Sequence, residues 1–174
     1  MKGLIHIYCG DGKGKTTASM GLTVRALGSG MKVVLTQFMK GDYSSELKIL
    51  RGIPNLQLVF CEKNFGFVWN MTEEEKAEAK AAYTRQFETA VQLATECKAD
   101  MLVMDEFMSC FELQFIDNEK ALEFLRNKPE NLEVVLTGRN PSAELCELAD
   151  YISEVKKIKH PFDKGINSRK GIEN

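Results

Sequence analysis

The sequence has few of the residues from which metal centres and disulfide frameworks are built. It contains two histidines, His6 and His160, so a multi-histidine metal site is excluded. Its five cysteines are odd in number and none forms a Cys-x-x-Cys pair, which argues against both a disulfide framework and a zinc site. Reduced thiols are therefore the expected state of these side chains.

Long apolar runs and a strong charge imbalance are also missing. No run reaches the roughly 20 apolar residues of a membrane-spanning helix, and no signal peptide is recognisable before the first expected strand. We therefore expect a cytoplasmic protein with no membrane partner. The net charge of −2 argues against broad nucleic-acid binding. The length of 174 residues suits a single domain over 1–174, with 159–174 as an irregular C-terminal tail.

The sequence does contain a glycine-rich stretch, GDGKGKTT at 10–17, between an apolar run and a helix-like segment. Strand, glycine-rich loop and helix in this order are the context of a phosphate-binding P-loop. Glycines let backbone N–H groups converge on phosphate oxygens, and the helix N-terminus adds positive potential. Lys15 can reach the outer phosphates, and the Thr16 hydroxyl can bind Mg²⁺. The alternative is an ordinary glycine–lysine turn after a strand.

The loop departs from the strict pattern GxxxxGK[ST] at one position. Cys9 stands where the pattern has its first glycine, and Gly10 comes one residue late. We therefore expect a tighter phosphate cradle than in ordinary NTPases. The predicted nucleotide-binding residues are Gly10, Asp11, Gly12, Lys13, Gly14, Lys15, Thr16 and Thr17.

Strands and helices are expected to alternate along the chain. The strands are expected at 4–8, 32–38, 56–61, 101–106, 133–137 and 151–158. The helices are expected at 17–27, at about 45–50 after a Ser44 or Ser45 cap, at 72–97 after a Thr72–Glu75 capping box, at 118–127 after Asp117, and up to Leu148. This pattern predicts an α/β fold whose mostly parallel sheet is covered by helices on both faces. Ligands bind at the carboxyl ends of such strands, so we expect a single active site there.

Three further groups of residues fall at that edge. Asp105 and Glu106 end an apolar strand, where a carboxylate of a P-loop protein holds Mg²⁺ directly or through water; a solvated helix cap is the alternative. Arg139 follows a strand and can neutralise a phosphate, or can be a plain turn arginine. Phe65, Phe67 and Trp69 alternate, which fits either one face of a core strand or a loop that meets a flat apolar partner. His160 is a candidate ligand or general acid in what can equally be a plain tail.

In this order and spacing, these segments resemble the P-loop ATP:cob(I)alamin (corrinoid) adenosyltransferases over essentially the whole chain. The shortened P-loop is itself part of the likeness. The motifs that carry the resemblance are GDGKGKTT at 10–17, QFMKG at 37–41, GFVW at 66–69, VMDE at 103–106, LTGRN at 136–140, ELAD at 147–150 and KHPFDKGI at 159–166.

The resemblance implies a RecA-like fold, a homodimer and a role in cobalamin biosynthesis. The implied reaction moves the 5′-deoxyadenosyl group of ATP to Co(I) of a corrinoid (cobalamin, cobinamide or cobyrinate diamide) and releases triphosphate. Residues 10–16 would hold the phosphates of a nucleotide bound in reversed orientation, and Thr16 with Glu106 would bind Mg²⁺, with Asp105 supporting. Phe67 and Trp69 would lie under the corrin and keep the lower axial ligand off cobalt, so that a flavin-type reductant can reduce Co(II). The candidate catalytic residues are Lys15, Phe67, Trp69 and Arg139.

The chain departs from the family at two points. Asp11 stands where many members have asparagine, which adds a negative charge beside the nucleotide, and the N-terminal extension of longer members is lacking, so we expect a more open corrinoid face. Two other functions stay open: a P-loop ATPase or kinase that acts by phosphoryl transfer, and a non-catalytic carrier of nucleotide or corrinoid. Free triphosphate as a product distinguishes the transferase from both.

Overall fold

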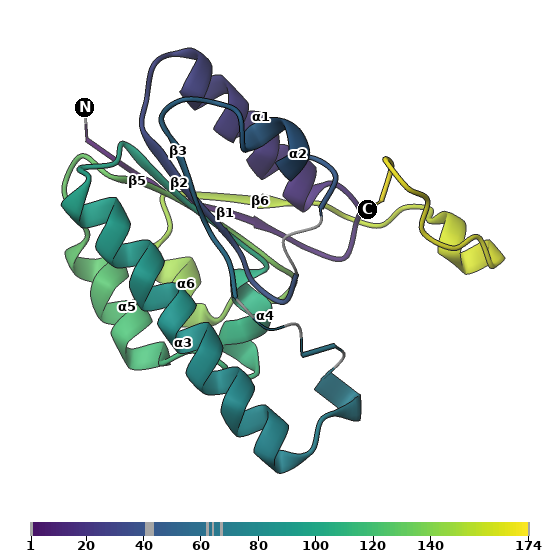
Figure 1. Ribbon diagram of the computed structural model, residues 1–174. Coiled ribbons are helices and arrows are strands. Elements are labelled where there is room, and N and C mark those ends of the chain that lie inside the picture. Colours follow the sequence, from purple (N-terminus) through teal and green to yellow (C-terminus); the bar gives the residue numbers. More distant parts are fainter. Residues whose placement is uncertain (1, 41–43, 62, 64, 67, 174) are drawn as a thin grey trace.

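A computed structural model describes residues 2–40, 44–61, 63, 65–66 and 68–173 (Figure 1). Within this part of the chain, six strands form one sheet in the order β3-β2-β4-β5-β1-β6, and every pairing is parallel. The strands are β1 (Ile5–Cys9), β2 (Val33–Gln37), β3 (Leu56–Val59), β4 (Met101–Asp105), β5 (Glu133–Thr137) and β6 (Tyr151–Glu154). The predicted parallel α/β sheet is thus confirmed.

Helices cover both faces of this sheet, as predicted. The face with α1 and α2 and the face with α3 to α6 are separated by the strands in Figure 1. The helices are α1 (Lys15–Gly28), α2 (Leu47–Leu50), α3 (Glu73–Glu96), α4 (Phe107–Glu112), α5 (Asn118–Asn127) and α6 (Ala143–Leu148), with short 3₁₀ turns η1 (Val68–Asn70) and η2 (Pro161–Lys164). None of the helices in the described ranges is long and apolar enough to cross a membrane.

Burial explains the composition of the strands. The central strands β2 and β4 are buried along their whole length and carry the near-continuous apolar runs VVL and MLVM, as a strand covered on both faces requires. Strand β6 is exposed along its whole length and lies at the sheet edge, where the more polar sequence predicts it. It ends at Glu154 and not at the predicted Ile158, because its partner β1 ends at Cys9, which pairs with Glu154.

Two of the predicted helix caps are present and one is not. Thr72 and Glu75 form the capping box of α3, with N···O distances of 3.2 Å and 2.8 Å. Asp117 accepts the Lys120 N–H at 3.2 Å and begins α5. The prediction that Ser44 or Ser45 caps α2 is wrong: this helix follows Glu46 and has no side-chain cap.

Several other differences in element boundaries lie at the carboxyl edge of the sheet. Helix α1 begins at Lys15 and not at Thr17, so the P-loop lysine is itself helical. Strand β4 ends at Asp105 because Glu106 adopts a left-handed φ of 56°, and the unpredicted helix α4 follows at once. Strand β3 ends at Val59, two residues before the predicted end.

Candidate functional site

The glycine-rich loop links β1 to α1 and lies against the chain that follows β6. Gly10 and Gly14 have φ values of 105° and 124°, which L-residues with side chains rarely adopt. A Cβ on Gly10 or Gly12 would approach the Val155 carbonyl oxygen to 2.5 Å or 2.7 Å. The Gly12 N–H donates to that same oxygen at 2.7 Å. The glycines are thus required both by backbone conformation and by close packing.

The side chains of Lys15 and Asp11 contact different parts of the protein. The Lys15 ammonium is buried and donates to the Gly12 carbonyl at 2.9 Å, and burial lowers the pKa of this side chain, with Glu106 opposing. Asp11 is exposed, and its Oδ1 accepts the Lys157 N–H at 2.9 Å, which is the main cause of its lowered pKa. An asparagine Oδ1 could accept the same hydrogen bond, so this contact does not require the negative charge.

Asp105 is fully buried and joins four elements through its carboxylate. Oδ1 accepts the Thr137 hydroxyl of β5 at 2.7 Å. Oδ2 accepts Thr16 Oγ1 of α1 at 3.2 Å, Gln37 Nε2 of β2 at 3.1 Å and Lys40 Nζ at 2.8 Å. The solvated-cap alternative is therefore wrong for Asp105. Thr137 was missed by the sequence interpretation, because only the pairing of β4 with β5 shows that it faces this carboxylate.

Glu106 occupies the next position but a different environment. Its N–H donates to Thr137 Oγ1 at 2.9 Å, and its half-buried carboxylate accepts the Ser109 hydroxyl at 2.9 Å. The left-handed backbone at Glu106 turns the chain away from the strand direction, so the two neighbouring acids are separated: Asp105 lies beneath the loop and Glu106 lines its mouth.

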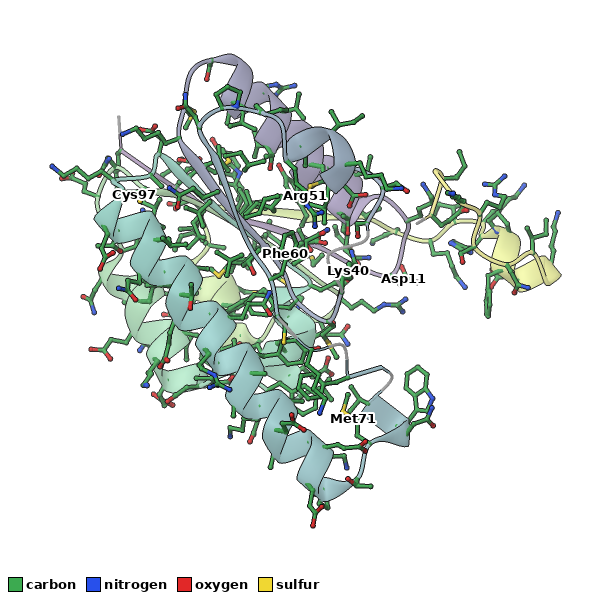
Figure 2. The ribbon with its side chains drawn as sticks, in the orientation of Figure 1. Asp11, Lys40, Arg51, Phe60, Met71 and Cys97 are labelled. Atoms are coloured by element: carbon green, nitrogen blue, oxygen red, sulfur yellow. The ribbon has the colours of Figure 1, made fainter. Side chains whose placement is uncertain are left out.

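That mouth is a small hollow of about 220 Å³ at the carboxyl edge of the sheet. It brings together most of the predicted residues, including exposed Arg139, whose carbonyl accepts the Gly10 N–H at 3.1 Å. The lining residues are Asp11, Gly12, Lys13, Gly14, Lys15, Thr16, Thr17, Glu106, Arg139, His160, Ile172 and Glu173. Figure 2 shows Asp11 and Lys40 at this same end of the sheet.

Two residues of the C-terminal tail, Ile172 and Glu173, line this hollow, and the sequence analysis predicted neither of them. The tail is not irregular throughout, since η2 lies within it, and its end returns to the P-loop (Figure 1). Arg169 pairs with Glu173 at 2.9 Å, and its hydrogen bonds lower the pKa of Glu173 to about 2, with a smaller effect from Lys13. A negative charge therefore faces the P-loop from the tail.

Phe65 and Trp69 do not lie on one face of a strand. Trp69 lies in η1 and is 78% exposed, whereas Phe65 packs against the core, with its ring 5.7 Å from that of Tyr83. Phe67 lies outside the described residues. The core-strand alternative is thus wrong for Trp69, and core packing is right for Phe65. The segment joins α3 through Met71, which Figure 2 labels well away from Lys40.

Oxygen atoms predominate among the potential metal ligands at this edge, where His160 supplies an imidazole. No group of three or more His, Cys, Asp or Glu side chains in the described ranges could hold a metal without further ligands. The Thr16 hydroxyl, the two carboxylates and substrate phosphates form the hard oxygen set that Mg²⁺ prefers. Gln37 Oε1 adds a buried acceptor to which the described structure assigns no hydrogen-bond donor. These residues fit a magnesium ion that arrives with a nucleotide.

A parallel sheet with a glycine-rich loop, a buried lysine and adjacent acids at its carboxyl edge defines a P-loop nucleotide-binding protein. The family model described as "ATP:corrinoid adenosyltransferase BtuR/CobO/CobP" matches residues 1–174. The chain belongs to this family.

Curated relatives agree with this family. The corrinoid adenosyltransferase of Escherichia coli (strain K12) is 31% identical over 172 residues, which cover 99% of this chain and 86% of the relative. That of Sinorhizobium sp is 34% identical over 174 residues, or 99% of this chain and 80% of the relative. EssC (ATPases 2 and 3) from Geobacillus thermodenitrificans aligns with a TM-score of 0.49 at 15% identity, over 97% of this chain and 35% of that one.

Proposed function

We propose that this chain transfers the 5′-deoxyadenosyl group of ATP to Co(I) of a corrinoid and releases triphosphate. The observation that carries the proposal is the intact P-loop site within a chain that matches the adenosyltransferase family along its full length. In this reaction a Co–C bond forms, the C5′–O bond breaks, and the triphosphate leaves with the electron pair. The P-loop therefore holds a leaving group and not a phosphoryl donor. The nucleotide would be bound in an orientation reversed from that in ordinary P-loop enzymes.

The protein supplies charge neutralisation and positioning. Lys15, Arg139 and residues 11–17 line the hollow. The Gly10 and Gly12 N–H groups donate to protein carbonyls, so Lys15, Arg139 and the backbone N–H groups of residues 13–17 would bind the phosphates. Cob(I)alamin is itself the nucleophile, so no side chain has to take that role. Holding C5′ in line with cobalt is then the main remaining contribution.

Thr16 and Glu106 would bind Mg²⁺, with Asp105 supporting. The hard oxygen ligands of the site support this proposal, and the ion would neutralise charge on the departing triphosphate. Asp105 lies 3.2 Å from Thr16 Oγ1 and fixes the orientation of that hydroxyl. Glu106 lines the mouth of the hollow, where a nucleotide-bound ion would meet it.

Phe67 and Trp69 would lie under the corrin and keep the lower axial ligand off cobalt. The exposure of Trp69 supports this proposal, because an indole that is 78% exposed is accessible to a large flat ligand. A flavin-type reductant for Co(II), a homodimeric assembly, a cytoplasmic location and one functional domain over 1–174 belong to the same proposal.

The decisive experiment supplies the purified protein with ATP, Mg²⁺ and chemically reduced cobalamin or cobinamide. We expect a light-sensitive Co–C product and one triphosphate for each corrinoid alkylated. ADP or diphosphate as the product would instead indicate an ATPase or kinase. Tight corrinoid binding without turnover would indicate a carrier.

A further inference from the structure

Lys40 lies where the P-loop hydroxyl meets the buried carboxylate. Its Nζ is 2.8 Å from Asp105 Oδ2 and 3.1 Å from Thr16 Oγ1. Those two oxygens are themselves 3.2 Å apart and hydrogen-bonded. An ammonium group is thus in direct contact with both the Thr16 hydroxyl and the Asp105 carboxylate, which the proposed function assigns to the magnesium site.

The backbone before Lys40 explains this position. Phe38 is fully buried and its N–H donates to the Asp105 carbonyl at 2.9 Å, so the chain is anchored just after β2. Met39 then adopts a left-handed φ of 56°, which bends the chain away from the strand conformation. The Lys40 side chain reaches Asp105 from there and remains 31% exposed.

Charge compensation gives the contact a physical reason. Asp105 is fully buried, and a buried carboxylate without a nearby cation is strongly unfavourable. Thr16, Gln37 and Thr137, which also donate to it, are neutral. Among the described residues, Lys40 provides the ion pair of Asp105. Lys15 donates to the Gly12 carbonyl instead.

We propose that Lys40 is an internal counter-cation that occupies this site without metal and competes with the incoming divalent ion. The proposal rests on the proposed metal site at Thr16 and the acids. The Lys40 ammonium lies 3.1 Å from Thr16 Oγ1, and it cannot stay there once Mg²⁺ binds that oxygen at about 2.0–2.1 Å, because both are cations and Mg²⁺ needs octahedral oxygen ligands. The partly exposed, flexible stem lets Lys40 withdraw. It lines the adjoining hollow with Lys13, Thr16 and Thr17, so it can move towards bound phosphates.

The test measures Mn²⁺ binding without triphosphate by the electron paramagnetic resonance of the free ion, and binding of the Mn²⁺–triphosphate complex by equilibrium dialysis. Lys40→Met removes the charge and keeps most of the stem, so we expect Mn²⁺ to bind about tenfold more tightly than to the wild type. Lys48→Met is the matched control: this exposed lysine lines the same hollow and the charge change is equal. We expect less than a twofold change there.

A second readout is thermal unfolding. Without metal, Lys40→Met should melt at a lower temperature than the wild type, and saturating Mn²⁺ with triphosphate should reduce the difference. If Lys40→Met does not fold, Lys40→Gln, which can still donate to Asp105, takes its place with the same expectations.

Unchanged or weaker Mn²⁺ binding by the Lys40 variant would overturn the proposal, as would no Mn²⁺ binding by either protein in the presence of triphosphate. These measurements distinguish a failure of the Lys40 proposal from a failure of the proposed function. Tighter Mn²⁺ binding without adenosyl transfer would refute only the proposed function, and transfer with unchanged Mn²⁺ affinity would refute only the role of Lys40.

Discussion

At the scale of single residues, the P-loop site combines two kinds of contact. Lys15 is held by a neighbour three residues away, since its ammonium donates to the Gly12 carbonyl. Asp105 is held by partners as far as 89 residues away, on α1, β2 and β5 and in the loop after β2. Changes at the two residues should therefore have different consequences for folding and for activity.

Lys15→Ala and Thr16→Ala should each lower kcat/KM by about 10²-fold or more, because each removes charge or metal stabilisation at the departing triphosphate. Lys32→Ala, at the opposite end of the sheet, changes the same charge as Lys15→Ala and should leave kcat/KM near the wild-type value. Steady-state kinetics with pre-formed Co(I) would check this. Near-normal turnover in either P-loop variant would contradict the phosphate-cradle assignment.

The neighbouring acids should differ in stability. Asp105→Asn places an amide NH₂ among four donors and removes a buried charge partner of Lys40, so we expect a loss of about 2–3 kcal/mol in unfolding free energy. Glu106→Gln should change stability by no more than about 0.5 kcal/mol, while turnover and its Mg²⁺ dependence fall.

Denaturant unfolding and Mg²⁺ titration of the rate separate these effects. The roles would be reversed if Asp105→Asn folded normally and lost turnover, and Glu106→Gln retained it.

At the scale of elements, the segment between β3 and α3 divides into a part that packs on the core and a part that faces solvent. Phe65 contacts Tyr83 of α3, and the Trp69 side chain of η1 is exposed to solvent. Sequence alternation alone could not separate them, because both fit the same period of two. The division follows from the packing of α3 on the sheet.

Replacing Phe67 and Trp69 together with alanine should abolish turnover that begins from protein-bound Co(II)cobalamin and a flavin reductant. Much of the rate should survive with pre-formed Co(I), because the nucleotide site is untouched. Cobinamide, which has no tethered lower base, should be less affected than cobalamin. Parallel assays with the two cobalt states and the two corrinoids measure this difference.

Phe65→Ala is the control for packing. It should lower the unfolding free energy by about 1–3 kcal/mol, which is less than the loss on truncating a fully buried phenylalanine. The rates in both assays should fall together. Trp69→Ala alone should change stability by about 0.5 kcal/mol at most, since its side chain is exposed. A large fall in melting temperature, with an equal loss of turnover in both assays, would indicate that Trp69 has a structural role.

At the scale of the whole molecule, the site lies at the carboxyl edge of the sheet. Ligand binding at this site should raise the free energy of unfolding of the whole fold. Inorganic triphosphate with Mg²⁺ at about 100 times its Kd should add about 2.7 kcal/mol to the unfolding free energy, which raises Tm by about 5–10 °C. The nucleoside is not required for this effect. Lys15→Ala should abolish it, and differential scanning fluorimetry would detect the shift. Stabilisation by adenosine but not by triphosphate would contradict the prediction.

Much of this protein follows from local sequence. The apolar runs of β2 and β4, the capping box of α3, the Asp117 cap of α5 and the Gly-Lys-Thr at the start of α1 depend on neighbours within a few positions, so pattern and cap chemistry are enough to predict them. The P-loop and the two acids were placed correctly at the carboxyl edge for the same reason, since each ends a strand in a parallel sheet.

Tertiary structure alone decided the rest. Whether Asp105 or Glu106 is buried depends on a left-handed backbone at Glu106, and the reach of Lys40 depends on another at Met39; neither residue type favours that conformation. The contacts of Asp105 with Thr16, Lys40 and Thr137 join positions 89, 65 and 32 residues apart. Such contacts depend on the order of the strands and the packing of α1, which a local pattern of apolar and polar residues does not encode.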